Sequence, residues 1–163
     1  MCIAGVTACS DKDGDSDPTP PEAQGDFSLT APDGTFYTNG QTVSVTSVDA
    51  TGTMRLEFGV KNNTKKQITL TMGQKIVSSN YAEIAKHATF CWDACYSQLP
   101  LTDGFTANQP VAAGGAPLGA PSGDIMYIDA ATPSFEAKVE YTVTNSATGE
   151  KRTLAGLYKY TKK

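Results

Sequence analysis

The chain has 163 residues, a length typical of one domain with a single hydrophobic core. Hydrophobic residues make up 39% of it, and no apolar run approaches the roughly 18 residues that a transmembrane helix needs. Acidic residues concentrate in segment 11–26, so the rest of the chain is close to neutral. A nearly neutral body gives no electrostatic footprint for nucleic acid, and the single histidine, His87, excludes any site that needs two.

The first residues predict a site of lipid attachment. The sequence Val6-Thr7-Ala8-Cys9 resembles the lipobox of bacterial lipoproteins, in which small residues precede a cysteine that is acylated. The resemblance implies that Cys9 carries the lipid and that segment 1–9 is the end of a signal peptide. Only residues 3–8 form an apolar stretch before Cys9, whereas signal peptides have about 7–15 such residues, so either the true start lies upstream of Met1 or the chain is trimmed. The alternative to a lipoprotein is a cytosolic protein with an acidic start.

Segment 10–26 reads as an acidic tether. Its like charges repel one another and it has almost nothing apolar to bury, which predicts an extended, disordered stretch. An acidic run directly after a lipidated cysteine resembles the surface-export signal of outer-membrane lipoproteins of the Bacteroidota. The resemblance implies a lipid-anchored protein on the outer membrane of a Gram-negative bacterium, facing the cell surface or the periplasm.

Segment 27–163 reads as a series of short strands. Apolar and polar residues alternate in windows 54–61 and 135–144, and this period of two is typical of strands with one buried face. Shorter strand candidates are 27–30, 42–48, 67–72, 124–128 and 153–160. Turn-forming residues separate them at Pro32-Asp33-Gly34, Asn39-Gly40, 49–52, Asn62-Asn63 and 145–149. Seven or eight such strands predict an all-β fold, an antiparallel immunoglobulin-like β-sandwich, with 135–160 as its clearest hairpin.

Two stretches interrupt this pattern. Segment 81–89 contains Ala, Glu, Ile and Lys, which tolerate helix, and we expect one or two helical turns there. Segment 107–123 is rich in Ala, Gly and Pro and predicts a long surface loop, the kind of segment that often carries function. The two lysine pairs, Lys65-Lys66 and Lys162-Lys163, read as a turn and a frayed chain end.

The most distinctive motif is Phe90-Cys91-Trp92-Asp93-Ala94-Cys95-Tyr96. In an exported protein we expect Cys91 and Cys95 to be oxidised to a disulfide. Four extended steps would separate their Cα atoms by about 13 Å, whereas a disulfide tolerates only about 4.4–6.8 Å. Segment 92–94 must therefore turn back or coil.

The motif also carries a family resemblance. Together with the strand that ends in Asn62-Asn63-Thr64 and the alternating strand from Phe135, it resembles small secreted or lipid-anchored immunoglobulin-like β-sandwich domains of the Bacteroidota that contain Phe-Cys-Trp-x-x-Cys-Tyr. The resemblance covers roughly 54–143. It implies a fold and an exported location, and it indicates no particular activity.

A metal site is the alternative reading of the two cysteines. His87, Cys91 and Cys95 are spaced so that they would share one face of a helix, and such a cluster could bind zinc or copper. A structural zinc site usually takes four protein ligands and a blue-copper site takes two histidines, so the sequence favours the disulfide. We therefore predict no metal and no cofactor.

The sequence also argues against catalysis. The two cysteines have three residues between them instead of the two of a Cys-x-x-Cys redox motif, and no Gly-x-Ser-x-Gly motif is present. We predict a structural or interaction domain that is not an enzyme. The alternative is a module that binds a glycan or a protein through Trp92, Tyr96 and loop 107–123, although a Trp92 packed on the disulfide would leave no such platform. The predicted partners are the membrane, through Cys9, and a glycan or protein.

Overall fold

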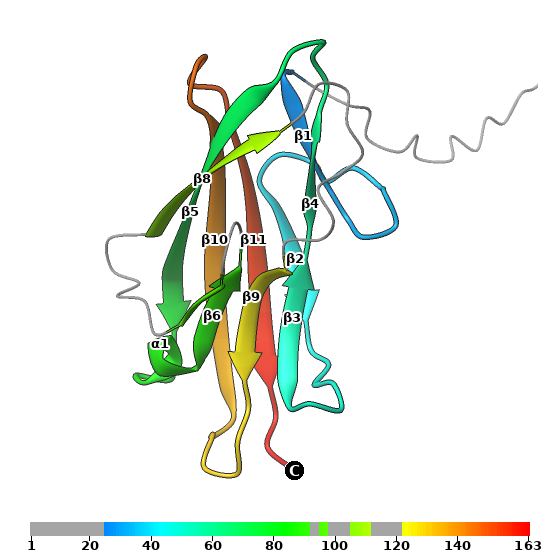
Figure 1. The fold of residues 1–163 in the computed structure, drawn as a ribbon. Coiled ribbons are helices and arrows are strands. Elements are labelled where there is room, and N and C mark those ends of the chain that lie inside the picture. Colours follow the sequence, from blue (N-terminus) through cyan, green and yellow to red (C-terminus); the bar gives the residue numbers. More distant parts are fainter. Residues whose placement is uncertain (1–24, 92–94, 98–104, 112–121) are drawn as a thin grey trace, which may run out of the picture.

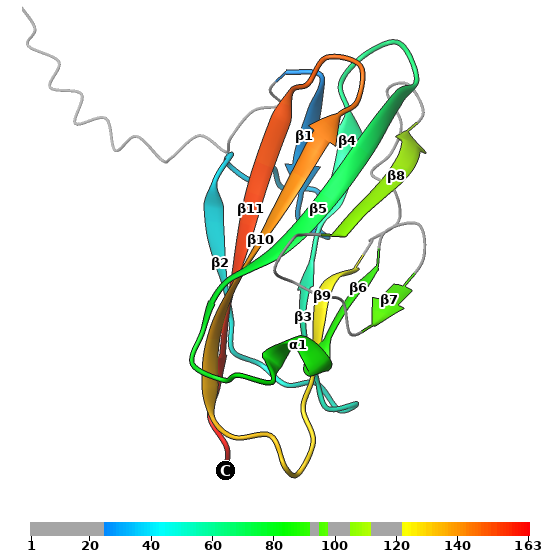
Figure 2. The same ribbon diagram turned by 90° about the vertical axis from the view of Figure 1, so that its left-hand side faces the viewer.

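A computed structural model describes residues 25–91, 95–97, 105–111 and 122–163, which form a β-sandwich of two facing layers (Figures 1 and 2). The strands of the larger sheet, in spatial order, are β2 (Gln41–Val45), β11 (Lys151–Tyr160), β10 (Phe135–Asn145), β5 (Ile68–Ser79) and β8 (Phe105–Val111). Those of the second sheet are β3 (Thr53–Glu57), β9 (Ser122–Tyr127), β6 (Ala88–Cys91) and β7 (Cys95–Ser97). A third pair is β1 (Phe27–Thr30) with β4 (Gly59–Asn62), and the helix is α1 (Ile84–His87).

The predicted all-β, immunoglobulin-like sandwich is confirmed, with two differences. The described residues form eleven strands, more than the seven or eight expected. Ten residues after β1, the chain crosses to the other layer, where β2 pairs in parallel with β11 while the other strand pairs are antiparallel. None of the described helices is long and apolar enough to cross a membrane.

The core forms around the β10–β11 hairpin, which the alternation predicted. Every second residue of β10 is buried, and β11 pairs with it from Phe135 opposite Tyr160 to Thr144 opposite Lys151. Tyr141 and Tyr158 are fully buried, and their hydroxyls lie 3.1 Å apart. Side chains of this size each contribute roughly 1.5–3 kcal/mol when they leave water, so this hairpin supplies much of the stability.

The predicted strand at 54–61 is divided between two partners. Its first part, β3, pairs with β9, and its second part, β4, pairs with β1. Phe58 lies at the break and is fully buried, its ring centroid 5.3 Å from that of Tyr141. The alternation is continuous in the sequence because the same face of the chain meets the core on both sides of the break.

The predicted loop at 107–123 is wrong in part. Residues 107–111 belong to β8 and residues 122–123 to β9. Pro110 is tolerated because β8 is an edge strand of its sheet, where a residue without an N–H group need not break a ladder. The helical turn expected within 81–89 is confirmed by α1.

Candidate functional site

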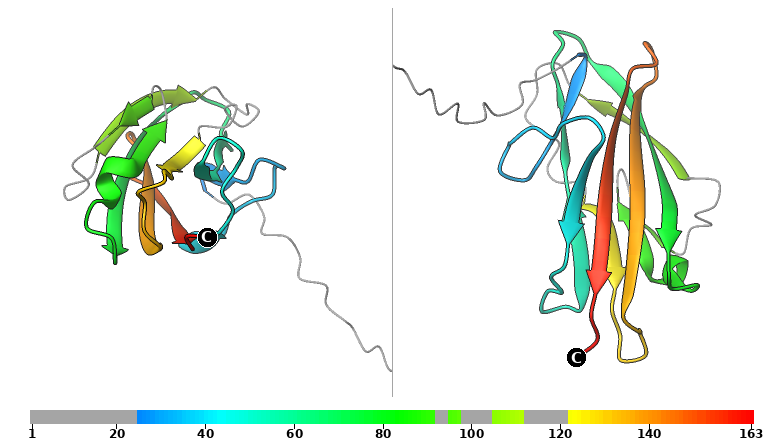
Figure 3. Two further views of the ribbon diagram at one scale, coloured as in Figure 1. Left: turned by 90° about the horizontal axis from the view of Figure 1, so that it is seen from below. Right: turned by 180° about the vertical axis from the view of Figure 1, so that it is seen from behind.

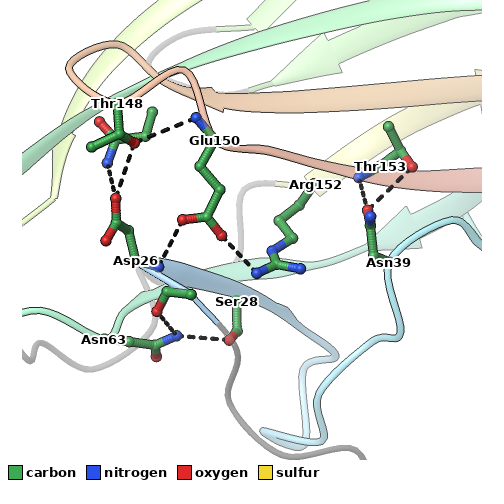
Figure 4. Close-up of polar contacts among 10 residues, drawn as sticks. Asp26, Ser28, Asn39, Asn63, Thr148, Glu150, Arg152 and Thr153 are labelled. Atoms are coloured by element: carbon green, nitrogen blue, oxygen red, sulfur yellow. Dashed lines mark hydrogen bonds and ion pairs between the residues drawn. The ribbon is translucent and has the colours of Figure 1, made fainter.

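The two ends of the sandwich are built differently. At the end where the described chain begins, a polar cluster joins β1 to the tip of the β10–β11 hairpin (Figure 4). We call this cluster the clasp; its residues are Asp26, Asn145, Thr148, Glu150 and Arg152. The Asp26 amide donates to Glu150 Oε2 at 2.8 Å, while Asn145 Nδ2 and Thr148 Oγ1 each donate to Asp26 Oδ2 at 3.0 Å. Arg152 Nη2 lies 2.6 Å from Glu150 Oε1, and both side chains are largely buried.

Glycine is required where the chain enters the clasp. Gly25 has a φ of +63°, and a Cβ atom built there would overlap the side chains of Glu150 and Arg152. Asn63 Nδ2 donates to the Gly25 carbonyl at 3.2 Å and to Ser28 Oγ at 2.9 Å. These contacts close this end of the sandwich with polar groups that are far apart in the sequence.

The opposite end carries a groove. It is lined by residues 46–48, 128–130 and 159–163, and its volume is about 1050 Å³, near the upper limit of about 1,000 Å³ for typical ligand pockets. These segments are the chain after β2, the connection from β9 to β10, and the end of β11 with the residues that follow it. All of them lie at the end of the sandwich that holds residue 163 (Figures 1 and 3). We call this feature the end groove.

The end groove opens because β2 and β11 separate. Their ladder ends with Val45 opposite Tyr158. The same register would place residues 46–48 opposite residues 159–161, but no backbone hydrogen bond joins these two segments where the structure describes them. Val48, in the diverging segment, is 40% exposed.

The turn that follows explains the divergence. Asp49 Oδ1 accepts hydrogen bonds from the amides of Thr51 and Thr53 at 2.8 and 3.0 Å, and the hydroxyls of both threonines also donate to the carboxylate. These bonds, with that of the Thr51 hydroxyl the largest contribution, hold the pKa of Asp49 well below its usual range. The turn thus fixes the path that takes 46–48 away from β11.

The charged residues that line the end groove are mostly cationic. They are Lys159, Lys162 and Lys163 against one acid, Asp129. The Asp129 carboxylate accepts hydrogen bonds from the Thr132 hydroxyl and amide, both at 2.8 Å, and these lower its pKa. Because the Asp129 carboxylate is already hydrogen-bonded within its turn, the charged groups that remain for a ligand are the lysines.

Two of these lysines have fixed positions. Lys162 Nζ donates to the carbonyl of Ala130 at 2.7 Å, and its amide donates to Ser134 Oγ at 2.9 Å. Lys159 Nζ lies 3.0 Å from Glu136 Oε2, and both side chains are about half exposed. An ammonium group bound to a carbonyl keeps two further donors, so Lys162 can also bind an anion.

The predicted site residues lie elsewhere. Cys91 and Cys95 stand directly opposite each other in the β6–β7 pair, so the chain reverses direction between them, as expected. Residues opposite in an antiparallel pair have Cα atoms about 4.5–5.5 Å apart, within the range that a disulfide needs. Tyr96 lies in β7 opposite Phe90. Trp92 and Cys9 fall outside the described residues.

The alternative arrangement, with His87, Cys91 and Cys95 on one helical face, does not form. His87 ends α1, whereas both cysteines lie in strands. His87 Nδ1 lies 2.8 Å from the Tyr127 carbonyl, and Nε2 lies 3.2 Å from the Tyr81 hydroxyl. Because a carbonyl only accepts, Nδ1 donates the proton in its contact with Tyr127, and in the neutral imidazole Nε2 then accepts from the Tyr81 hydroxyl. Across the described ranges, no group of three or more His, Cys, Asp or Glu residues is arranged to hold a metal ion.

Comparison with known proteins supports the fold. No family model and no curated protein matches the chain. Among solved structures, the N-terminal domain of PorA superposes with a TM-score of 0.57 and 19% identity, over 82% of this chain and 96% of that one. The fold is similar to that of the PorA domain. Weaker matches are the CooA pilin subunit of enterotoxigenic Escherichia coli (TM-score 0.42, 10% identity, 85% and 100% covered) and PapD-like domain 7 of human CEP192 (0.36, 6%, 99% and 99%).

Sequence patterns identify neither end of the sandwich. Lys162 and Lys163 resemble a frayed terminus in the sequence, yet they line the end groove. Asp26 resembles part of the acidic tether, yet it belongs to the clasp. One feature of the sequence could have separated Asp26 from the tether. Asp26 directly precedes the strand candidate 27–30, whereas the acids before it do not.

Proposed function

We propose that this protein is a non-catalytic lipoprotein of the outer membrane of a Gram-negative bacterium, anchored through Cys9, whose β-sandwich is an interaction domain. One observation carries the proposal: the clasp, where the described chain begins, and the end groove lie at opposite ends of the sandwich (Figures 1 and 3). An anchor attached through residues before Gly25 would join the domain at the clasp end, with the end groove at the far end from the attachment point.

The lengths and energies are compatible with this arrangement. Residues 10–24 can span at most about 50 Å when fully extended, enough to hold the domain clear of the lipid headgroups. Each acyl methylene buried in the bilayer contributes about 0.8 kcal/mol, and stable anchoring needs more than one chain. The clasp would keep β1 in place when this tether is under load.

Two acids near the end groove have structural roles. Threonine hydroxyls and backbone amides donate to the carboxylates of Asp49 and Asp129 and lower their pKa values. Both groups stabilise turns.

The anchor is tested by metabolic labelling with a palmitate analogue in cells that express the native gene. We expect label on the wild-type protein and none on Cys9→Ser. Cys2→Ser is the matched control, because Cys2 precedes the lipobox and would leave with the signal peptide. Label retained on Cys9→Ser, or absent from the wild type, would contradict the proposal.

We also propose that Cys91 and Cys95 form a disulfide in the exported protein, a pairing supported by their opposite positions in β6 and β7. Trypsin should release one peptide, residues 87–138, that contains both cysteines. We expect this peptide to resist alkylation until it is reduced, and to be lighter than the reduced form by two hydrogen atoms. Two free thiols in exported protein would disprove the pairing.

A further inference from the structure

We infer that the end groove binds an extended, acidic polypeptide segment of a partner protein, which adds as a short strand beside the end of β11. The inference rests on the proposed interaction role and names the partner of that role. It does not depend on lipid attachment.

The backbone at the end groove is prepared for strand addition. Thr153 turns its carbonyl toward the β2 side, where the Gly40 amide donates to it at 2.8 Å. Backbone direction alternates along a strand, so Lys159, six residues later, turns its carbonyl to the same side. The ladder with β2 has ended at Tyr158, and no described backbone amide bonds to the Lys159 carbonyl. β10 pairs with the other side of β11 as far as Tyr160, so only the groove side is open.

The side chains select the partner's composition. Lys162 and Lys163 follow the open end of β11 after one residue, Thr161, and the one acid of the groove, Asp129, accepts hydrogen bonds within its own turn. Val48 and Tyr160 supply apolar surface beside these cations. Side chains alternate along an added strand, so a segment that alternates acidic and apolar residues would place carboxylates near the lysines and apolar groups on Val48 and Tyr160.

A glycan fits these features less well. Sugar binding usually relies on a flat, exposed aromatic ring, whereas the Tyr160 ring packs against Phe135 with centroids 5.8 Å apart and is partly buried. An unpaired carbonyl at the end of a ladder is satisfied by a backbone amide in line with the strand, which a peptide provides. An acidic polysaccharide is therefore treated as an outcome of the test.

The test titrates the purified 163-residue chain with a short peptide of alternating Asp and Val, followed by isothermal calorimetry and by backbone amide shifts in NMR. Three further probes are the same peptide with alternate amides N-methylated, a peptide of alternating Lys and Val, and polygalacturonate. We expect binding of the first peptide only, with the largest shifts at 46–48 and 159–163. N-methylation keeps the charge and removes the amides that would bond to β11.

Matched variants separate the end groove from general charge. Lys162→Ala with Lys163→Ala should weaken binding at least about tenfold, the loss expected when charge-assisted hydrogen bonds are removed. Lys65→Ala with Lys66→Ala removes the same charge in the β4–β5 connection, at the clasp end, and should leave affinity unchanged. Amide spectra of each variant show whether it has folded.

Four results would overturn the inference: no binding of the acidic peptide, equal binding of its N-methylated form, equal loss in both lysine variants, or binding of polygalacturonate alone. Failure here leaves the labelling result at Cys9 unaffected. Failure of lipid labelling in turn leaves this binding assay unaffected, so the two proposals are tested separately.

Discussion

The clasp and the end groove show how one sandwich can be closed at one end and open at the other. At the clasp, the Asp26 amide donates to the Glu150 carboxylate across 124 residues of sequence, and Asn145 and Thr148 donate to the Asp26 carboxylate. At the end groove, two neighbouring segments that could have continued a ladder separate instead, and leave cations and Val48 exposed. The closed end suits attachment of a tether and the open end suits a partner, because polar groups already paired have little to offer a ligand.

The largest expected effect is at the clasp. Glu150→Ala removes an ion pair whose side chains are only 23% and 17% exposed, and leaves Arg152 without its carboxylate. We expect a loss of about 2 kcal/mol in the free energy of unfolding, measured by urea denaturation. Glu136→Ala, which removes the half-exposed partner of Lys159, is the matched control and should cost less than about 1 kcal/mol. Equal losses would remove the contrast between the two ends.

The next effect tests the entry to the clasp. Gly25→Ala places a methyl group against Glu150 and Arg152 at a position with positive φ. Gly34 also has a positive φ, +88°, but a Cβ atom there would have no neighbour within 4 Å. Gly34→Ala should therefore lower the free energy of unfolding only by the backbone strain, about 1–2 kcal/mol. We expect Gly25→Ala to lower the melting temperature more than Gly34→Ala. Similar melting temperatures for the two variants would mean that Glu150 and Arg152 move aside without loss of stability.

A smaller effect concerns acid stability at the end groove. Because hydrogen bonds from Thr51 and Thr53 lower the folded-state pKa of Asp49, its stabilisation is complete above the unfolded pKa of about 3.9 and is lost as pH falls below it. The wild type should melt higher than Asp49→Asn at pH 7, and the gap should shrink below about pH 4. Calorimetric melting temperatures at several pH values would show this; a gap that does not change with pH would refute it.

The smallest expected effect on stability is at Val48. Val48→Ala and Val77→Ala remove half-exposed side chains, and each should change the free energy of unfolding by less than about 0.5 kcal/mol. Only Val48→Ala should also weaken binding of the acidic peptide, because Val77 does not line the end groove. A stability loss at Val48 as large as that of Glu150→Ala would show that this end is closed after all.

The sequence predicts the parts of this fold that depend on local pattern. The alternation from Phe135 and the turn at 145–149 define the β10–β11 hairpin because strand and partner are adjacent in the chain. The bounds of β1 are also predicted correctly from its local pattern, although its partner, β4, is not adjacent in the chain. Local periodicity also predicts which face of 54–61 is buried.

The rest depends on contacts between distant residues. The parallel pairing of β2 with β11 and the change of partner at Phe58 leave no periodic signature, because side-chain alternation is the same whichever strand lies alongside. β8 was missed because Asn108 and Pro110 disfavour strands, a bias that the pairing with β5 overrides. The end groove follows from the point at which a ladder stops, which no local pattern marks.

The pairing of β2 with β11 also limits the order in which the strands can pair during folding. Asn39 and Thr153 are 114 residues apart, so the outer strand of the larger sheet has no neighbour until β11 has been synthesised and released. Until then, the first half of the chain carries an unsatisfied strand edge, and such an edge is prone to aggregation. High contact order of this kind also predicts folding in milliseconds to seconds once the last strand arrives.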